Sequence, residues 1–389
     1  MRAWLVVPIL LAACATTGAG VDGGRDAGAA QDGARARDTS GSDDATPSDA
    51  AGAEAGADAG LPTRTFVYVG LATGDLVTLD GATLRELARA RTGDFPSFVA
   101  ASADGAHLYV VHESADEVAS IDVASDGTTT VTERQPALGG PTHVALDPAG
   151  QHVFVASYGS GRVSVYALDG SGALSRPASS DAVTCAHAHQ VVPSAAGDVL
   201  YVPCLGDDTV VVRRIGAGGL LTPASVASTA AGAGPRHLAL SRDGRFAYVI
   251  DELGSAIDVF AVGVDGALAS VETVPTLPTG FTGTNACAEV LVSRDDRFVY
   301  GSNRGHESVV VFARDPSSGR LTLVEHEPAG GMHPRSMALS RDGAHLYVAD
   351  RDSDVLVVLD VASDGRLSLA RTLRVAGRPY FVGEFLAPR

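Results

Sequence analysis

The 389-residue sequence contains no lysine, so all 29 of its basic residues are arginines. Arginine alone supplies the positive charge, and the number of arginines is therefore weak evidence for anion binding. Acidic residues outnumber the arginines, which gives a formal net charge of −17 and a pI near 4.9. Because nucleic acids bind to basic surfaces, this balance argues against a nucleic-acid partner.

The sequence also lacks a hydrophobic run long enough to span a membrane. Its apolar stretch, residues 4–13, is shorter than the ~20 residues that a transmembrane helix needs. It follows Arg2 and ends in Leu-Ala-Ala-Cys at Cys14, which resembles a bacterial lipobox. We therefore predict a lipoprotein signal in residues 1–14, with lipidation of Cys14 and the lipid as the only membrane contact. Ala15 favours the outer membrane; the alternative is an ordinary secretory peptide with an incidental cysteine.

Aromatic residues are absent from residues 15–62, which consist mostly of Ala, Gly, Asp, Ser and Thr. Such a segment buries too little apolar surface to offset the entropy lost on ordering. We predict that it is a flexible acidic tether without chemistry of its own. The folded domain is then expected over residues 63–389.

Cysteine is scarce, and after Cys14 only Cys185, Cys204 and Cys287 remain. Cys185 precedes the expected inner strand of one repeat, and Cys204 ends the strand that returns beside it. A disulfide between these two is geometrically allowed in an oxidising compartment, and two buried thiols are the alternative. The spacing is not that of a zinc site.

A short aromatic-centred β pattern recurs seven times through the rest of the chain. The aromatic residues of the seven copies are Tyr68, Tyr109, Phe154, Tyr201, Tyr248, Tyr300 and Tyr347. Their spacings of 41, 45, 47, 47, 52 and 47 residues are typical of propeller blades rather than of helical solenoids. We therefore predict an all-β fold, a seven-bladed β-propeller.

Each repeat divides into four strands, because it carries two Gly- or Asp-rich turns between alternating apolar runs. The first copy lacks the strand of the type Gly-x-Pro that opens the other repeats. Residues 377–382 supply such a strand at the C-terminus. We expect this strand to complete the first blade innermost and so close the ring; an open or six-bladed ring is the alternative.

Polar residues recur at two positions of the repeat that should meet at one end of the ring. Inner strands run antiparallel to their partners, so the start of the first and the end of the second emerge on the same face. Strand starts supply Thr142, His143, His189, Gln190, Arg236, His237, Ala288, Glu289, Arg335 and Ser336. Strand ends supply Glu113, Tyr158, Leu205, Glu252, Arg304 and Arg351.

Opposed charges in a narrow opening shift each other's pKa values and can bind an anion while activating water. Polar residues also line propeller channels simply because water fills them. We favour a functional interpretation for the set formed by Arg236, Glu252, Glu289 and Arg304.

Several of these segments resemble the bacterial seven-bladed lactonase family, which includes 6-phosphogluconolactonase and carboxymuconate-lactonising enzymes. The resembling segments are Pro96 to Phe98 with Glu113, Ala156 to Gly161, His187 to His189, Gly234 to His237, Asp251 to Leu253, Ala288 to Val290, Ser302 to His306 and Pro334 with Arg335. The resemblance implies a lactone hydrolase that requires neither metal nor cofactor.

The resemblance also implies site residues. The family's reaction centre falls on His189, Arg236, Glu252 and Arg304. The arginines would hold the substrate's carboxylate or phosphate and polarise the lactone carbonyl, and Glu252 or His189 would handle the proton. The residues expected to contact substrate around this centre are Glu113, His143, His187, His237, Glu289, Arg335 and Arg351.

The chain departs from the family pattern in ways that bear on its substrate. It has Cys204 where the family usually has Asp, Asp251 where Asn is usual, Arg351 where Gln is common, and a short loop before His187. An envelope protein would also not meet a cytosolic phosphogluconolactone. We therefore expect a different small anionic lactone, and a monomeric enzyme.

Two other functions were considered. A non-catalytic propeller would bind a protein or glycan through its loops. A metal-dependent lactonase fits less well, since Arg236 and Arg304 would place positive charge beside the cation. Catalysis predicts arginines arranged around a ligand-sized space, whereas mutual salt bridges favour the non-catalytic alternative.

Overall fold

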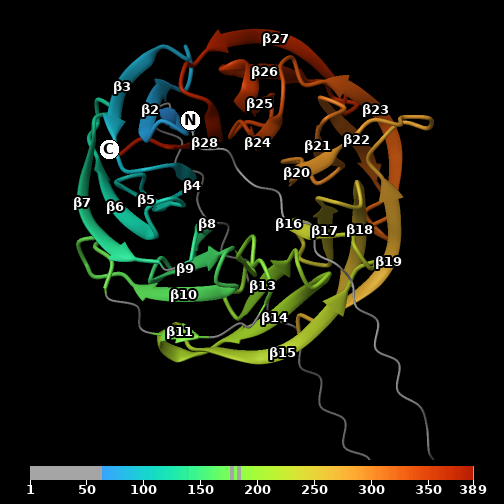
Figure 1. The fold of residues 1–389 in the computed structure, drawn as a ribbon, viewed down its shortest axis with the longest axis horizontal. Coiled ribbons are helices and arrows are strands. Elements are labelled where there is room, and N and C mark those ends of the chain that lie inside the picture. The colour runs from blue at the N-terminus through green and yellow to red at the C-terminus, as the bar shows by residue number, and fades with distance from the viewer. Residues whose placement is uncertain (1–63, 138, 176–178, 182–184, 389) are drawn as a thin grey trace, which may run out of the picture. The chain divides into compact units, whose positions relative to one another are not determined.

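The computed structural model describes residues 64–137, 139–175, 179–181 and 185–388. Within them the chain forms seven antiparallel sheets of four strands each, arranged as a ring (Figure 1). The seven-bladed propeller predicted from the repeat spacing is confirmed. The signal sequence, Cys14 and the whole tether lie outside the described residues.

The first three blades, each given from its innermost strand outward, have the following bounds. They are β28 (Pro379–Leu386), β1 (Thr65–Leu71), β2 (Asp75–Asp80) and β3 (Glu86–Arg91); β4 (Pro96–Ala101), β5 (His107–His112), β6 (Glu117–Val123) and β7 (Thr129–Pro136); and β8 (Pro141–Leu146), β9 (His152–Ser157), β10 (Arg162–Ala167) and β11 (Ser179–Asp181).

The fourth to seventh blades follow the same order. They are β12 (Val192–Pro193), β13 (Val199–Cys204), β14 (Thr209–Ile215) and β15 (Leu221–Ser228); β16 (Pro235–Leu240), β17 (Phe246–Asp251), β18 (Ala256–Val262) and β19 (Leu268–Pro275); β20 (Ala286–Val292), β21 (Phe298–Arg304), β22 (Ser308–Arg314) and β23 (Leu321–Pro328); and β24 (Pro334–Leu339), β25 (His345–Asp350), β26 (Val355–Val361) and β27 (Leu367–Arg374).

Two 3-10 turns, Ala217–Gly219 and Arg351–Ser353, are the helical segments of the described residues. No helix in this part of the chain is long and apolar enough to cross a membrane.

The seven repeat aromatics all lie on the second strand of their blades and are buried. Valine, leucine and isoleucine side chains of the second and third strands surround them, in clusters that each draw on two neighbouring blades. A blade therefore completes its hydrophobic core only by packing against the next one.

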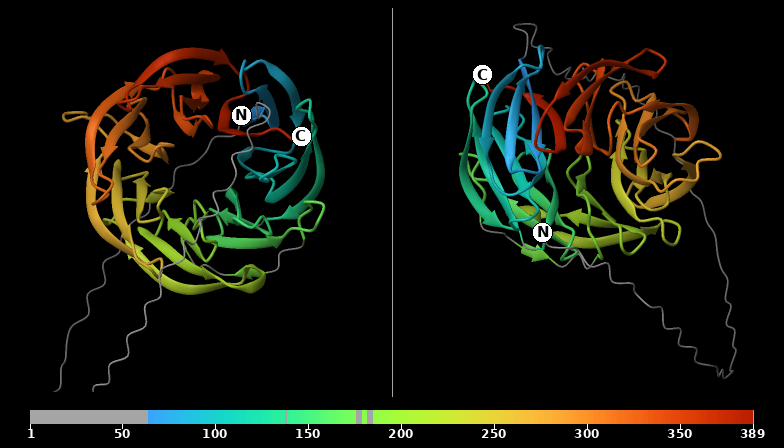
Figure 2. Two further views of the ribbon diagram at one scale, coloured as in Figure 1. Left: turned by 180° about the vertical axis from the view of Figure 1, so that it is seen from behind. Right: turned by 45° about the horizontal axis from the view of Figure 1, so that its top comes forward.

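The ring closes through the C-terminal strand, as predicted. Strand β28 pairs antiparallel with β1, from Thr65 opposite Leu386 to Leu71 opposite Pro379. The two strands lie side by side in every view of Figures 1 and 2. Because the first blade takes its innermost strand from the other end of the folded chain, the two ends hold the ring together.

Most inner strands begin with a β-bulge. In five blades the pairing skips the residue after the first proline of the strand; the skipped residues are Ser97, Thr142, Arg236, Arg335 and Tyr380. A bulge sets two consecutive residues against one on the partner strand and re-aims their side chains. This explains how paired polar residues such as Arg236 and His237 can both be directed toward the centre of the ring.

Candidate active site

A carboxylate shared by two arginines stands at the end of the ring where the inner strands begin. Arg236 Nε lies 2.8 Å from Glu252 Oε2, and Arg304 Nη2 lies 3.1 Å from the same oxygen. Arg236 comes from the bulge of β16, Glu252 directly follows β17, and Arg304 ends β21. Two neighbouring blades thus contribute the three charges that the repeat alignment predicted to meet.

Backbone carbonyls fix both guanidinium groups. Arg236 Nη1 donates to Ala288 O at 2.5 Å, while Arg304 Nε donates to Ala286 O at 3.1 Å and its Nη2 to Cys287 O at 2.6 Å. The Arg236 side chain is 2% exposed and that of Glu252 is 23% exposed. Both guanidinium groups are therefore held in fixed positions, and Glu252 is the most exposed of the three side chains.

The pKa values of two carboxyl groups near this centre are shifted in opposite directions. Burial opposes ionisation of Glu252, but Arg236, Arg304 and Arg335 outweigh it and lower its pKa. Burial dominates at Glu113 and raises its pKa, although Arg335 and Arg236 oppose the shift. Oε2 of Glu113 is buried and has no hydrogen-bond partner in the described part of the chain. The arginines thus favour the ionised form of Glu252, whereas burial opposes ionisation of Glu113.

A layer of imidazoles is packed together with an acid residue of β20. His237 Nδ1 lies 2.6 Å from Glu289 Oε1, and the His237 ring centre is 5.1 Å from that of His189 and 5.7 Å from that of His143. Burial lowers the pKa values of all three histidines well below the ordinary value. These rings are therefore neutral at physiological pH, and His189 acts as an uncharged hydrogen-bonding group.

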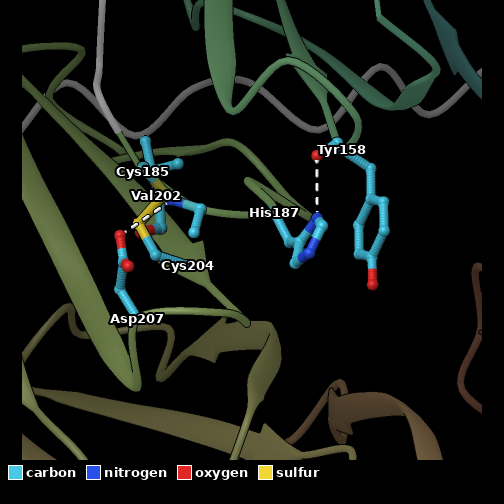
Figure 3. Close-up of a disulfide and its surroundings, with 7 residues drawn as sticks. Tyr158, Cys185, His187, Val202, Cys204 and Asp207 are labelled. Atoms are coloured by element: carbon cyan, nitrogen blue, oxygen red, sulfur yellow. Dashed lines mark hydrogen bonds between the residues drawn. A yellow bond between two sulfur atoms is a disulfide. The ribbon is translucent and has the colours of Figure 1, made fainter. Parts of the chain in front are cut away.

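A disulfide anchors the segment that carries the remaining predicted histidine. Cys185 and Cys204 are joined, with their Cα atoms 5.4 Å apart. Beyond the bond, the exposed His187 ring stacks on Tyr158 with ring centres 4.2 Å apart (Figure 3). His187 Nδ1 also lies 3.2 Å from Tyr158 O. Cys287, the third cysteine, is a buried free thiol.

Arg335 and Arg351 meet around an aromatic ring that the sequence analysis did not include in the site. The Arg335 guanidinium lies 4.1 Å from the ring centre of Tyr380, and that of Arg351 lies 5.7 Å away. Arg351 Nη1 also donates to the Tyr380 hydroxyl at 3.4 Å. Tyr380 occupies the same bulge position as Arg236, so the repeat alignment contained the signal for it.

The predicted residues therefore fall into connected groups. The charged centre contains Arg236, Glu252 and Arg304, with Glu113 and Arg335 within its electrostatic reach. His143, His189, His237 and Glu289 form the imidazole layer, while His187 and Arg351 contact aromatic rings. Among the described residues, no three or more His, Cys, Asp or Glu side chains are grouped to hold a metal ion.

Known proteins resemble this chain along most of its length. A family described as "Lactonase, 7-bladed beta-propeller" matches residues 69–383. The 6-phosphogluconolactonase of Yersinia pestis (strain Pestoides F) is 31% identical over 305 residues, which are 76% of this chain and 90% of that protein. The corresponding protein of Serratia proteamaculans is 31% identical over 274 residues, covering 69% of this chain and 82% of its own length.

Solved structures show the same likeness. The periplasmic gluconolactonase of Pseudomonas aeruginosa superposes with a TM-score of 0.77 at 30% identity, covering 84% of this chain and all (100%) of that one. A putative 6-phosphogluconolactonase of Bacteroides fragilis gives a TM-score of 0.75 at 26% identity, covering 83% of this chain and 98% of that one.

Proposed function

The chain belongs to the lactonase family of seven-bladed β-propellers, and from that premise we propose that it hydrolyses a lactone at the centre formed by Arg236, Glu252 and Arg304. The observation that carries this assignment is the single carboxylate oxygen shared by two guanidinium groups. Both contacts are made to Oε2, so the other oxygen of Glu252 is the one that would take a proton from water.

In the proposed reaction, Glu252 removes a proton from a water molecule while the oxygen of that water attacks the lactone carbonyl carbon. Guanidinium N–H groups of Arg236 and Arg304 stabilise the negative charge that develops on the carbonyl oxygen. The bond between the acyl carbon and the ring oxygen then breaks, and the alkoxide takes the proton back from Glu252. The product is an open-chain hydroxy acid.

His189 has a different part in this proposal. Its pKa is lowered by burial and then by Arg236, so the imidazole is neutral and a weak base: it keeps one N–H but lacks the second proton that a general acid would give. Its Nδ1 is buried without a hydrogen-bond partner in the described residues. It would therefore orient substrate or water as a neutral hydrogen-bonding group and leave the proton transfer to Glu252.

Mutual salt bridges were the arrangement expected of the non-catalytic alternative, and Glu252 does pair with both arginines. These pairs use only Oε2, however, and leave a side chain that is 23% exposed. Replacing Glu252 with Gln distinguishes catalysis from the non-catalytic alternative, because Gln keeps the side-chain volume but cannot accept the proton. We expect the turnover of a lactone panel to fall roughly 10²- to 10⁴-fold with the fold intact by circular dichroism. If the wild-type protein never exceeds the spontaneous hydrolysis rate, the enzymatic proposal fails and the binding-module alternative replaces it.

We further propose that the enzyme works outside the cytoplasm, held at the envelope, with the outer membrane favoured, by a lipid on Cys14. The disulfide between Cys185 and Cys204 supports an oxidising compartment, and the relative from Pseudomonas aeruginosa is described as periplasmic. Cys14→Ala should release the protein from the membrane fraction without changing the melting temperature of the propeller. Equal retention of both forms in the membrane fraction would contradict the anchor.

A further inference from the structure

The arginines of the site differ in whether they have a counter-ion. Arg236 and Arg304 share Glu252, and Arg351 Nε lies 2.8 Å from Asp352 Oδ1. Arg335 makes no ion pair and no hydrogen bond with the part of the chain that the structure describes; its recorded contact is the ring of Tyr380. It is the one arginine of the four without a carboxylate partner in those residues.

The surroundings hold Arg335 in place without neutralising it. Its guanidinium lies over the Tyr380 ring, and that ring is itself held by Phe95, whose ring centre is 4.2 Å away, and by Arg351. Burial followed by the charge of Arg304 works against the cation and lowers the pKa of Arg335, while Tyr380, Glu113 and Glu252 oppose that shift. Arg335 as a whole residue is only partly buried, so water still reaches it. A bound anion would supply the counter-ion that the described residues do not provide.

The N–H groups of Arg335 have no acceptor in the described residues, although its Cζ lies 4.1 Å from the Tyr380 ring centre. They are therefore left for a ligand, and a guanidinium can match the two oxygens of a carboxylate or phosphate. Glu113, the nearby carboxyl, forms no ion pair with Arg335 in the described residues, and burial raises its pKa, which opposes a negative charge there. The charged acceptor for Arg335 is therefore expected from outside the chain.

We propose that Arg335, positioned by Tyr380, binds an anionic group of the substrate that is distinct from the lactone carbonyl, and so selects lactones that bear a carboxylate or a phosphate. This inference rests on the proposed lactonase function. It assigns different tasks to the arginines: Arg236 and Arg304 act at the carbonyl and hold Glu252, whereas Arg335 recognises charge elsewhere on the same molecule. It replaces our expectation that Arg236 and Arg304 hold the anionic group.

The test compares Arg335→Gln with wild type on three lactones: 6-phosphoglucono-δ-lactone, the carboxylated glucaro-1,4-lactone and the neutral glucono-δ-lactone. We expect KM to rise roughly 10- to 100-fold for a charged lactone, the equivalent of one lost charged hydrogen-bonding contact, with little change for the neutral one. Whichever charged lactone shows the rise in KM identifies the group, phosphate or carboxylate, that Arg335 binds. Arg378→Gln is the matched control, because Arg378 is exposed, lies near the same end and is paired with Asp352 at 2.9 Å.

Equal losses on charged and neutral lactones, or a wild type that prefers the neutral lactone, would overturn the inference. Calorimetric titration with 6-phosphogluconate and D-glucarate separates it from the proposed function. If the wild type hydrolyses no lactone but binds either acid, and Arg335→Gln alone loses that binding, the charge-recognition site stands while hydrolysis does not. If hydrolysis occurs and Arg335→Gln leaves KM unchanged, hydrolysis stands and the site assigned to Arg335 is wrong.

Discussion

Glu289 and His237 form a neutral hydrogen-bonded pair in the imidazole layer, with Oε1 and Nδ1 2.6 Å apart. Burial raises the pKa of Glu289 to about 8 and lowers that of His237 well below its ordinary value. Both shifts favour the uncharged forms, so the carboxylic acid donates to the imidazole. The imidazole layer therefore carries no formal charge, unlike the neighbouring arginine-rich centre.

This pair predicts a loss of stability at alkaline pH. The pKa of Glu289 is higher in the folded protein than its ordinary 4.5, so its contribution is complete below about 4.5 and is lost as the pH rises through about 8. Glu289→Gln keeps a donor for His237 but cannot ionise. Between pH 6 and pH 9 the melting temperature of this variant, measured by calorimetry, should therefore fall less than that of the wild type.

Asp251 and Asp350 also affect how the melting temperature depends on pH. The prediction therefore concerns the difference between wild type and Glu289→Gln. Burial raises the pKa values of both to about 8, so they titrate in the same window in wild type and variant. Parallel stability curves for the two proteins would contradict a protonated Glu289.

The C-terminal strand should be essential for the ring. Truncation before Gly377 removes β28, including the buried side chains of Phe381 and Val382, and exposes the edge of β1. We expect a cooperative loss of stability across the whole propeller, seen as one shifted or missing thermal transition. Truncation after Leu386 is the control because it keeps β28 complete, and a melting curve unchanged by the longer deletion would show that closure does not depend on this strand.

The period and closure of the ring could be predicted because they depend on local patterns. Each blade repeats one buried aromatic residue, such as Tyr109 or Tyr248. The innermost strand that the first repeat lacks is found at the C-terminus, in β28. The fourth blade departed from the expectation of uniform strands: its inner strand is reduced to Val192–Pro193. Before it, Ala188 and Cys204 form an isolated bridge, and backbone hydrogen bonds join His189 to Pro203 and His187 to Leu205.

The meeting of these charged side chains was predictable, but their pairing was not. The repeat alignment brought Arg236, Glu252 and Arg304 to one end of the ring, but the sequence does not specify which carboxylate serves which arginine. That depends on the bulges of the inner strands, which leave little trace in a hydrophobic pattern. Tyr380 was missed for a different reason: the alignment marked its position, but charged or polar residues were sought there and an aromatic residue fills it.

The disulfide should support the fourth blade where its ladder is short. Cys185 and Cys204 are separated by 19 residues, a loop whose closure contributes roughly 3 kcal/mol in the chain-entropy estimate. The double variant Cys185→Ala, Cys204→Ala should lower the melting temperature and raise KM, because the segment of His187 and His189 loses its anchor. Cys287→Ala serves as the control for loss of a buried thiol, and an unchanged KM in the double variant would limit the bond to a stabilising role.

The acid limb of the pH–rate profile should identify Glu252 as the base. Because the arginines lower its pKa below the ordinary 4.5, kcat/KM should stay constant as the pH falls and decline only below that value. Arg304→Met removes one of the two guanidinium groups within 3.1 Å, so the carboxylate becomes easier to protonate and the decline should move to higher pH. His189→Asn keeps Glu252 and its arginines, and should lower the rate without abolishing the limb. If the limb disappears in His189→Asn and survives in Glu252→Gln, the proton is handled by the histidine and the assignment of the base is reversed.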